Sequence, residues 1–384
     1  MRIAHVTWRF APPGGIVANI REIGRRLASG GDEVEVFTSD INVISGERRE
    51  FVHSTMVDGI PVHRFPLAPE PFARFRFERM TGLVEALSQS GADIIHAHNH
   101  RYGYVLQAAR AARRAGIPFV VTLSYHPAQV TESLLKRGMV RLADFAFGAS
   151  AYQLARAVIV QSELEARLVR PFVPASRLRM ILDGIDLGEW RAPGADQPSG
   201  PPLPPAYFLY VGWLSRRKGV HHLIEALARL PPEVRRPLVL LGRDVGGRAG
   251  FEELGRQLGV SELLVWLDPL PRPAYREVVR HATALVLPSE WEAFGQVLVD
   301  AMAAGTPAIG TYAGAMPEVL DGGRSGLLVP FGDVDDLARA LRAVVEEPVA
   351  TRGRVQRGLE RVTRWDWSEV ARQHRELYRS IVGQ

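Results

Sequence analysis

The stretch PSEWEAFGQVLVDAMAAGTP, residues 288–307, decides the fold of this chain. An apolar run at 284–287 precedes it and another at 307–310 follows, and each predicts a buried strand. Between them, 295–304 repeats apolar residues at helical spacing, and Gly305 is placed to end that helix as a C-cap. Strand, loop, helix and strand make one βαβ unit, which predicts a parallel sheet.

The start of this predicted helix has the features of an anion site. Residues 294–297 supply its first backbone N–H groups, which have no partner inside the helix and favour a phosphate. Glu292 lies just before the helix, and Asp300 lies roughly 12 Å further along its axis at 1.5 Å per residue. We therefore expect a sugar diphosphate along the helix start, with a carboxylate holding hydroxyls at each end.

The same stretch resembles the donor-site signature of glycosyltransferase family 4, whose members are retaining enzymes of the GT-B fold. That signature is Pro-Ser, then Glu-x-Phe-Gly, a second Glu closing a Glu-x7-Glu spacing, and Ala-Met-Ala-x-Gly-x-Pro. Glu292 is the first acid here, and Asp300 departs from the usual second Glu. The resemblance implies a set of donor-binding residues in this stretch: Glu292, Ala293, Phe294, Gly295, Gln296, Val297 and Asp300.

A second motif lies earlier, in YVGWLSRRKG at 210–219. It resembles the family's Val-Gly-Arg-Leu…Lys-Gly motif, in which an Arg and a Lys bracket the leaving diphosphate. Lys218 and Gly219 match that motif, whereas Trp213 occupies the Arg position, and the resemblance implies Gly212 as a donor contact. The resemblance implies Lys218 as a catalytic residue, with Arg216 or Arg217 of the same loop as the replacement for the missing arginine.

Two further segments of the second half resemble the family. The end of LLVWLDPL (263–270) contacts the nucleotide base in family members, which implies Leu267 and Leu270 as base contacts. The segment 315–344 matches the family's Pro-Glu-Val…Gly-Leu-Leu-Val pattern. Its Asp333-Val-Asp335 string would indicate a metal in the GT-A fold, but it precedes a helix pattern, and we interpret it as a helix cap.

The first half carries weaker signals. Gly14-Gly15, between a strand and a helix pattern, allows the backbone to approach a ligand closely. It resembles a loop of the family that faces donor and acceptor.

The strand pattern of 92–103 ends in a histidine-rich cluster that also permits a zinc interpretation. With no acidic partner adjacent we expect no metal, and the resemblance implies an acceptor lining at His98 and Asn99.

The family usually carries a histidine near the donor sugar, soon after the strand and loop of 117–128. Ser124 stands where the commonest alignment puts it, and His126 lies two residues later. We therefore expect His126 to be the catalytic and acceptor-side histidine. The three expected catalytic residues are His126, Lys218 and Glu292.

Length and composition fit two domains. A chain of 384 residues exceeds one ordinary core, and the Pro/Gly-rich segment 191–206 is typical of a linker. We predict an acceptor domain at 1–190, a nucleotide-sugar domain at 207–364, and a helix at 365–384 that returns to the first domain. The resemblance implies the α/β GT-B architecture: two Rossmann-like domains facing a central cleft that holds the active site.

The net charge and the cysteine count exclude some classes of function and favour others. There is no cysteine, which excludes thiol catalysis, and the net charge is +5 with no nucleic-acid motif. We interpret the basic surface as suited to a diphosphate donor. Two basic, aromatic segments, 71–87 and 134–157, fit core helices with a charged outer face, or a surface for anionic membrane or a lipid-linked acceptor.

The expected function is a retaining glycosyltransferase that needs no metal or other cofactor. Its donor is a nucleotide diphosphate sugar, and its acceptor is a glycan, a lipid-linked molecule or a small molecule. Because the N-terminus enters a strand pattern directly, without a signal peptide, we expect a cytoplasmic protein, with peripheral contact at the inner membrane face left open. Two alternatives stay open: a non-catalytic sugar-nucleotide-binding protein, and a GT-B-fold sugar-nucleotide epimerase.

Overall fold

The computed structural model describes residues 1–10, 15–40, 54–68, 79–125, 134–192 and 202–383. Their contacts divide the chain into two compact units. Unit 1 is Met1–Gly184 with Trp367–Gln384, and unit 2 is Ile185–Asp366. The division falls ahead of the expected linker at 191–206 because α6 (Leu187–Arg191) packs in unit 2, where the Trp190 ring meets the Tyr275 ring edge-on.

Unit 1 is built on an eight-stranded sheet, ordered β3-β4-β2-β1-β5-β6-β7-β8. Every neighbouring pair is parallel except the hairpin of β3 and β4. The strands are β1 (Arg2–Val6), β2 (Glu33–Ser39), β3 (Ser54–Val57), β4 (Ile60–Phe65), β5 (Ile94–His98), β6 (Phe119–Thr122), β7 (Ala157–Val160) and β8 (Leu178–Met180).

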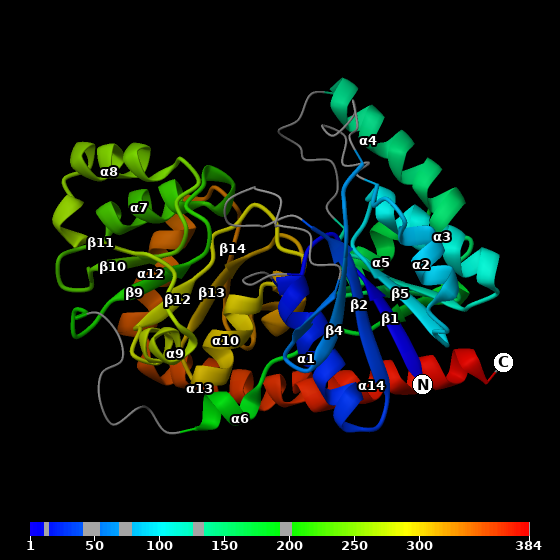
Figure 1. Cartoon of the computed structure of the whole chain (residues 1–384). Helices are drawn as coiled ribbons and strands as arrows, with labels where there is room; N and C mark the ends of the chain where they lie inside the picture. Colours follow the sequence, from blue (N-terminus) through cyan, green and yellow to red (C-terminus); the bar gives the residue numbers. More distant parts are fainter. Residues whose placement is uncertain (11–14, 41–53, 69–78, 126–133, 193–201, 384) are drawn as a thin grey trace. The chain divides into compact units, whose positions relative to one another are not determined.

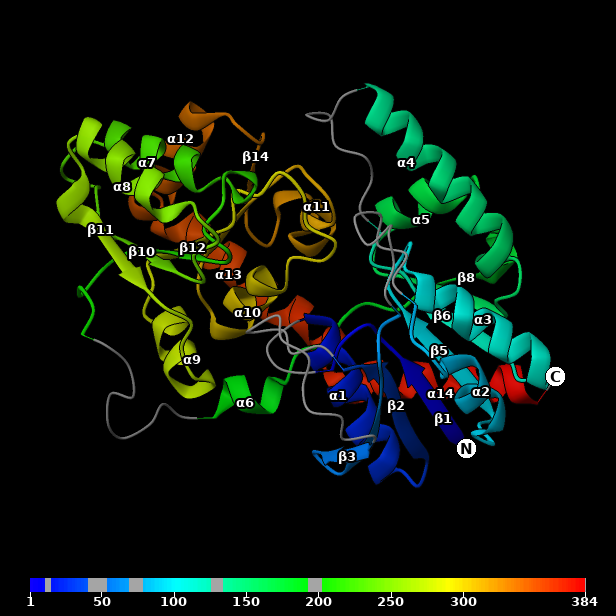
Figure 2. The same cartoon turned by 45° about the horizontal axis from the view of Figure 1, so that its top comes forward.

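Helices cover both faces of this sheet (Figures 1 and 2). The α1 and α14 helices pack on one face, and α2 and α3 pack on the other. Because both faces are covered, the central strands β5, β6 and β7 are wholly buried, and they are apolar except for His96, His98 and Thr122. The helices of unit 1 are α1 (Gly15–Ser29), α2 (Leu83–Gln89), α3 (Gly103–Ala115), α4 (Leu134–Phe147), α5 (Glu163–Val169) and α14 (Trp367–Val382).

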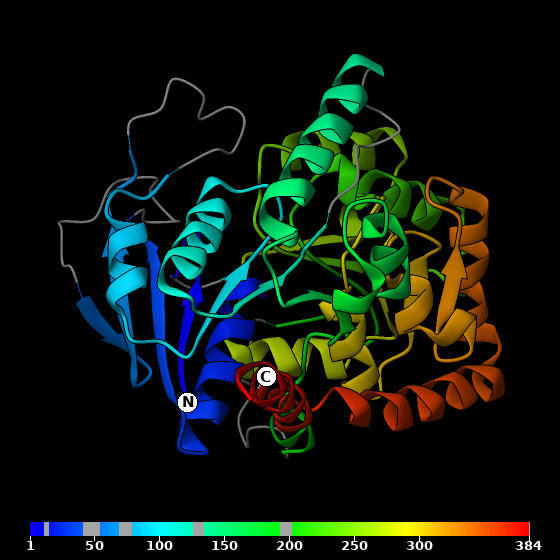
Figure 3. The ribbon, with the colours of Figure 1, turned by 90° about the vertical axis from the view of Figure 1, so that its right-hand side faces the viewer.

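The α4 helix differs from its neighbours in unit 1. It is joined to the carboxyl end of β6 through residues 123–133, so its N-terminal end lies toward that edge of the sheet, and there it extends past the strands (Figure 3). It continues into a π-helical turn, Gly148–Tyr152, whose Ala151 and Tyr152 are buried in the core.

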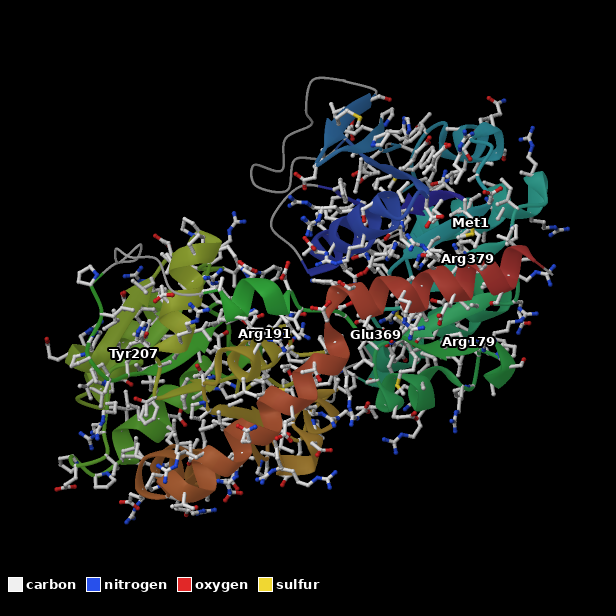
Figure 4. All side chains as sticks on the ribbon, turned by 90° about the horizontal axis from the view of Figure 1, so that it is seen from below. Met1, Arg179, Arg191, Tyr207, Glu369 and Arg379 are labelled. Atoms are coloured by element: carbon white, nitrogen blue, oxygen red, sulfur yellow. The ribbon has the colours of Figure 1, made fainter. Side chains whose placement is uncertain are left out.

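The last helix, α14, completes unit 1 although it follows unit 2 in sequence. Figure 4 shows Glu369 and Arg379 toward its two ends. It packs on α1, and its Arg375 Nε donates to Asp32 Oδ2, in the turn between α1 and β2, at 2.8 Å. Gly184 contacts the Trp367 ring so closely that any larger side chain there would overlap the indole.

Unit 2 contains a six-stranded, wholly parallel sheet ordered β11-β10-β9-β12-β13-β14. Together with unit 1 it confirms the expected α/β class with two Rossmann-like sheets. The strands are β9 (Phe208–Val211), β10 (Leu238–Leu241), β11 (Leu264–Leu267), β12 (Ala284–Val286), β13 (Ala308–Thr311) and β14 (Leu327–Val329). The helices are α6, α7 (Val220–Arg229), α8 (Arg248–Gln257), α9 (Arg272–Arg280), α10 (Gln296–Ala304), α11 (Met316–Val319), α12 (Val334–Glu346) and α13 (Pro348–Val362).

Local signals set several helix ends. Ser162 Oγ accepts from the Glu165 backbone N–H and caps α5. Asp333 caps α12 in the same way through the Asp336 N–H, which confirms the interpretation of the Asp-x-Asp string as a cap. Gly305 ends α10 with a positive φ of 73°.

Candidate active site

The expected donor residues of unit 2 meet at the carboxyl edge of its sheet, where ligands collect in open parallel sheets. Lys218 belongs to a short turn, Arg216–Lys218, between β9 and α7, and Glu292 belongs to the loop between β12 and α10. Lys218 Nζ lies 2.6 Å from Glu292 Oε1. The two side chains, 30% and 16% exposed, form an ion pair that water can still reach.

Close backbone approaches fix this pair. Gly219, with φ of 72°, lies so near the Pro288 carbonyl that a Cβ would overlap it, and the Glu290 N–H donates to the Arg217 carbonyl at 2.9 Å. On the other side, Gly314 lies equally close to the Glu292 backbone. Any larger residue at Gly219 or Gly314 would therefore push the two loops, and the ion pair, apart.

The α10 helix begins at Gln296, shortly after Glu292. Its N-cap is Gly295 (φ 90°), which has no side chain to satisfy the first N–H groups of the helix. Phe294 turns inward and meets the Trp365 ring edge-on, which fixes the entry of the chain into the helix. Ala293, Gln296 and Val297 stay partly exposed. An anion bound here would therefore meet backbone donors beside a lysine.

Asp300 occupies a different environment from the one expected. It is 3% exposed and accepts from the Tyr275 hydroxyl at 2.7 Å, with Arg272 Nη1 at 3.6 Å. Burial raises the pKa of its carboxyl, and Arg272 and Tyr275 oppose that rise. These partners come from α9, and no motif in the sequence pointed to them. A ribose would share this carboxylate with a structural network.

The other expected donor residues lie at the same edge, in the loops after β9 and β11. Gly242 lies so close to the Gly212 carbonyl that a Cβ at Gly242 would overlap it, and the Gly242 N–H donates to the Leu267 carbonyl. Leu267 and Leu270 are partly exposed. Arg217 is 62% exposed, with Nε 3.8 Å from Glu290, and Trp213, at the position of the family's arginine, is 61% exposed.

Unit 1 places its expected acceptor residues in two environments. Asn99, at the end of β5, has a positive φ of 86°, and its Nδ2 donates to the Tyr104 hydroxyl at 3.0 Å. His98 is only 2% exposed and points into the interior. The expectation that His98 lines an acceptor site is corrected, because its face of β5 is covered by α14. Gly14 and His126 lie outside the described residues, and Gly15 is the first residue of α1.

His98 belongs to a buried histidine cluster with His5, His96 and His374. His5 Nδ1 lies 2.9 Å from His98 Nε2, and His96 bridges Tyr378 and Thr122 at 2.6 and 2.8 Å. Ring nitrogens of His5, His96 and His98 all lie within 4.8 Å of one another, so these three are the residues able to hold a metal among those the structure describes. His5 and His96 are register partners on β1 and β5, a contact that sequence spacing does not reveal.

A second buried network lies beside the loop after β5. His100 Nε2 is 2.7 Å from Asp144 Oδ1, the Tyr125 hydroxyl donates to Asp144 Oδ2 at 2.9 Å, and Arg101 lies 3.3 Å from the same carboxylate. Asp144 belongs to α4, so this carboxylate ties α4 to the loops after β5 and β6. No sequence pattern pointed to this acidic partner of His100, because Asp144 lies 44 residues away along the chain.

These two sheets are those of the GT-B fold. Residues 195–360 match the family model of glycosyl transferases group 1, and residues 14–184 match a glycosyl transferase 4-like domain. The chain is 30% identical over 410 residues to the alpha-maltose-1-phosphate synthase of Mycolicibacterium smegmatis, covering 99% of this chain and all of that one. This chain therefore belongs to the glycosyl transferases group 1 family.

Other relatives agree with that assignment. The D-inositol 3-phosphate glycosyltransferase of Kribbella flavida is 28% identical over 391 residues, covering 96% of this chain and 91% of that protein. Among solved structures, the sucrose-phosphate synthase of Thermosynechococcus elongatus superposes with a TM-score of 0.79 at 24% identity, covering 100% of this chain and 99% of that one. Anabaena HepE in complex with UDP and glucose gives a TM-score of 0.77 at 19% identity, covering 99% and 100%.

We expect Asp300→Ala to weaken nucleotide binding and to lower stability at the same time. Losing a hydrogen bond between ribose and a charged group should cost ~1.5–3 kcal/mol of affinity, about 10- to 150-fold in Kd. Tyr275→Phe removes the hydroxyl that Asp300 accepts from and keeps the carboxylate. Calorimetric titration with UDP, GDP and ADP measures the role of Asp300 in nucleotide binding. A thermal melt measures its role in stability. If Asp300→Ala binds the preferred nucleotide as tightly as wild type and only melts earlier, Asp300 is purely structural.

Proposed function

We propose that this glycosyltransferase moves a sugar from a nucleotide diphosphate donor to an acceptor hydroxyl, with retention at the anomeric carbon and without a metal ion. The observation that carries this proposal is the Lys218–Glu292 pair, 2.6 Å apart, directly ahead of the first turn of α10. A cation, a carboxylate and helix N–H donors in one place suit a sugar diphosphate, whose one end is anionic and whose other end carries hydroxyls.

The difficult step is departure of the diphosphate while positive charge develops on the sugar. Lys218 and the N–H groups at 294–297 neutralise the leaving group, and this stabilisation grows as the charge on the leaving oxygen grows. Glu292 orients Lys218 and accepts donor hydroxyls. The acceptor oxygen bonds to the anomeric carbon on the side from which the phosphate leaves, and the departing phosphate oxygen takes the acceptor proton.

The alternative route uses Glu292 as a nucleophile, as in retaining glycosidases. It would form a covalent sugar–enzyme intermediate, whereas the front-face route forms none. An intact-mass measurement on enzyme quenched during turnover distinguishes the two, since only the nucleophilic route adds the mass of a sugar to the chain.

Names of the relatives suggest the first compounds to test. The HepE structures hold UDP and UDP-glucose, which supports a UDP-sugar donor. Another relative is named for D-inositol 3-phosphate. We propose UDP-glucose and D-inositol 3-phosphate as the first donor and acceptor to examine, beside GDP- and ADP-sugars and lipid-linked acceptors.

A mass-spectrometric screen of the purified protein with these donors, with and without EDTA, tests the proposal. We expect sugar transfer, or slow donor hydrolysis where no acceptor fits, at equal rates in both conditions. Elemental analysis of the same sample shows whether the His5, His96 and His98 cluster carries a metal that EDTA fails to remove. Sugar isomerisation without transfer would indicate an epimerase, and binding without turnover would indicate a non-catalytic protein. Loss of activity in EDTA that manganese restores would contradict metal independence.

A further inference from the structure

We infer that unit 2 carries a second ligand site, a groove between α7 and α8 that takes a small phosphorylated sugar or polyol. The two helices follow the neighbouring parallel strands β9 and β10, so they lie side by side with their first turns at the same end (Figures 1 and 2). The groove between them has a volume of about 260 Å³. Pockets for drug-sized ligands span ~300–1,000 Å³, so the occupant is smaller than a nucleotide sugar.

The floor of the groove is buried. Phe251 is 2% exposed, and His221, in the first turn of α7, is 7% exposed. The Nδ1 atom of His221 is buried and has no hydrogen-bond partner among the residues that the structure describes. Burial, together with His222 and Arg216, lowers the pKa of His221 to about 4, so its ring is neutral at pH 7 and offers one N–H and one lone pair. Buried polar atoms normally have a partner, and a molecule bound in the groove would supply one.

Gly250 keeps the groove open. It belongs to the first turn of α8 and lines the groove, yet a Cβ at this position would meet no described atom within 4 Å outside its own helix backbone. Packing within unit 2 therefore does not require a glycine here, and glycine is a poorer helix former than any residue except proline. The missing side chain instead leaves room for a ligand between the two helices.

The polar groups of the groove differ between its two ends. Arg216 lines it ahead of α7 and has no ion pair in the described part of the chain, so its guanidinium can bind a phosphate through two parallel hydrogen bonds. Further along the helices, Glu225, Glu253 and Gln257 line the groove, and Glu253 is paired with Arg256. Carboxylates and an amide are hydrogen-bond partners for hydroxyl groups. A molecule with a phosphate at one end and hydroxyls at the other matches this order.

The groove is separate from the expected donor site, although one turn borders both. Arg216 and Lys218 are the two ends of that turn, and Lys218 contacts Glu292 at the carboxyl edge of the sheet. All the other residues that line the groove belong to α7 and α8, and none of them is an expected donor contact. A molecule in the groove would therefore touch the turn that holds Lys218 without taking the place of the diphosphate.

Calorimetric titration of the full-length protein with ribose 5-phosphate and sorbitol 6-phosphate, without donor, tests the inference. We expect a Kd below about 1 mM for at least one of them, and roughly tenfold or weaker binding of inorganic phosphate, ribose and sorbitol, since each makes only part of the contacts. Gly250→Leu fills the groove and should weaken binding by about tenfold or more. The matched control is Gly353→Leu in helix α13, where a Cβ would meet only the Arg357 side chain at ordinary contact distance. This control should bind as wild type does.

Arg216→Ala is the second variant, because it leaves both helices intact. It should weaken binding of the phosphorylated compound by about 10- to 150-fold, the scale of a lost hydrogen bond to a charged group, and leave ribose and sorbitol unaffected. A thermal melt shows that each variant is folded.

Three outcomes would overturn the inference. Neither phosphorylated compound binds, or inorganic phosphate binds as tightly as they do, or a folded Gly250→Leu protein binds them as wild type does. The last result would place the compound elsewhere on the chain. Because the titration involves neither donor nor turnover, its failure is distinguishable from failure of the proposed sugar transfer.

Discussion

Lys218→Ala is expected to lower turnover by about 10²–10³-fold, the scale of one lost electrostatic contact to a developing charge. The fall should appear in both kcat and kcat/KM, because the lysine acts on charge that grows as the diphosphate leaves. Stability should change little: the Lys218–Glu292 pair is partly exposed, and pairs of this kind contribute about 0–1 kcal/mol. Steady-state kinetics with the preferred donor, together with a thermal melt, measures both quantities.

Arg229→Ala is the matched control for this variant. Arg229 also belongs to unit 2 and also makes an ion pair, 2.6 Å long, with Asp335. That pair lies on the exposed side of α7 and α12 and touches no expected donor residue, so its loss should leave turnover unchanged. A Lys218→Ala protein that folds and turns over like wild type would show that the lysine does not neutralise the leaving group.

Acidification from pH 7.5 to pH 5 should destabilise unit 1 by several kcal/mol. Burial lowers the pKa of His5 to about 3 and that of His374 to about 4, and burial together with neighbouring histidines holds the pKa of His96 and His98 well below the usual 6.5. The unfolded chain therefore binds more protons than the folded one below pH 6.5, and stability falls from there toward pH 4. At pH 5, His5 and His374 each cost about 2 kcal/mol, from 1.36 kcal/mol per pH unit below 6.5.

Urea unfolding at several pH values, followed by circular dichroism, measures this loss. His374→Leu removes one buried titrating ring, whose Nδ1 contacts only the Val370 carbonyl of its own helix turn. The variant should therefore lose about 2 kcal/mol less than wild type between pH 7.5 and pH 5. His281→Leu, at a side chain 69% exposed, is the control and should follow wild type. Equal pH dependence in all three proteins would rule out the histidine cluster as its source.

Local patterns in the sequence were sufficient for the fold of unit 2. The runs around 288–307 alternate apolar strands with a helix of apolar residues at helical spacing, and Gly305 and Asp333 mark helix ends by their side-chain chemistry or its absence. Such signals act over a few residues, so spacing alone reveals them. The two acids Glu292 and Asp300 were likewise placed on the correct loop and helix.

Contacts between distant residues could not be predicted in the same way. Lys218 and Glu292 each matched a motif, but nothing within either motif shows that their side chains touch across a separation of 74 residues. His98 was expected to line an acceptor site because it lies at the carboxyl end of a strand, where ligands collect in parallel sheets. Its burial depends on α14, whose Tyr378 bonds His96 from 282 positions away. The partners of Asp300, Tyr275 and Arg272, come from α9, because α9 packs against α10. Sequence spacing does not reveal this packing either.

The discontinuity of unit 1 also fixes the order in which the protein can be completed during synthesis. All of unit 2, Ile185–Asp366, is one uninterrupted segment and leaves the ribosome before α14 does. Unit 2 can therefore fold while unit 1 still lacks the helix that covers His5 and His96. Until α14 emerges, that face of the first sheet is open to water and to chaperones.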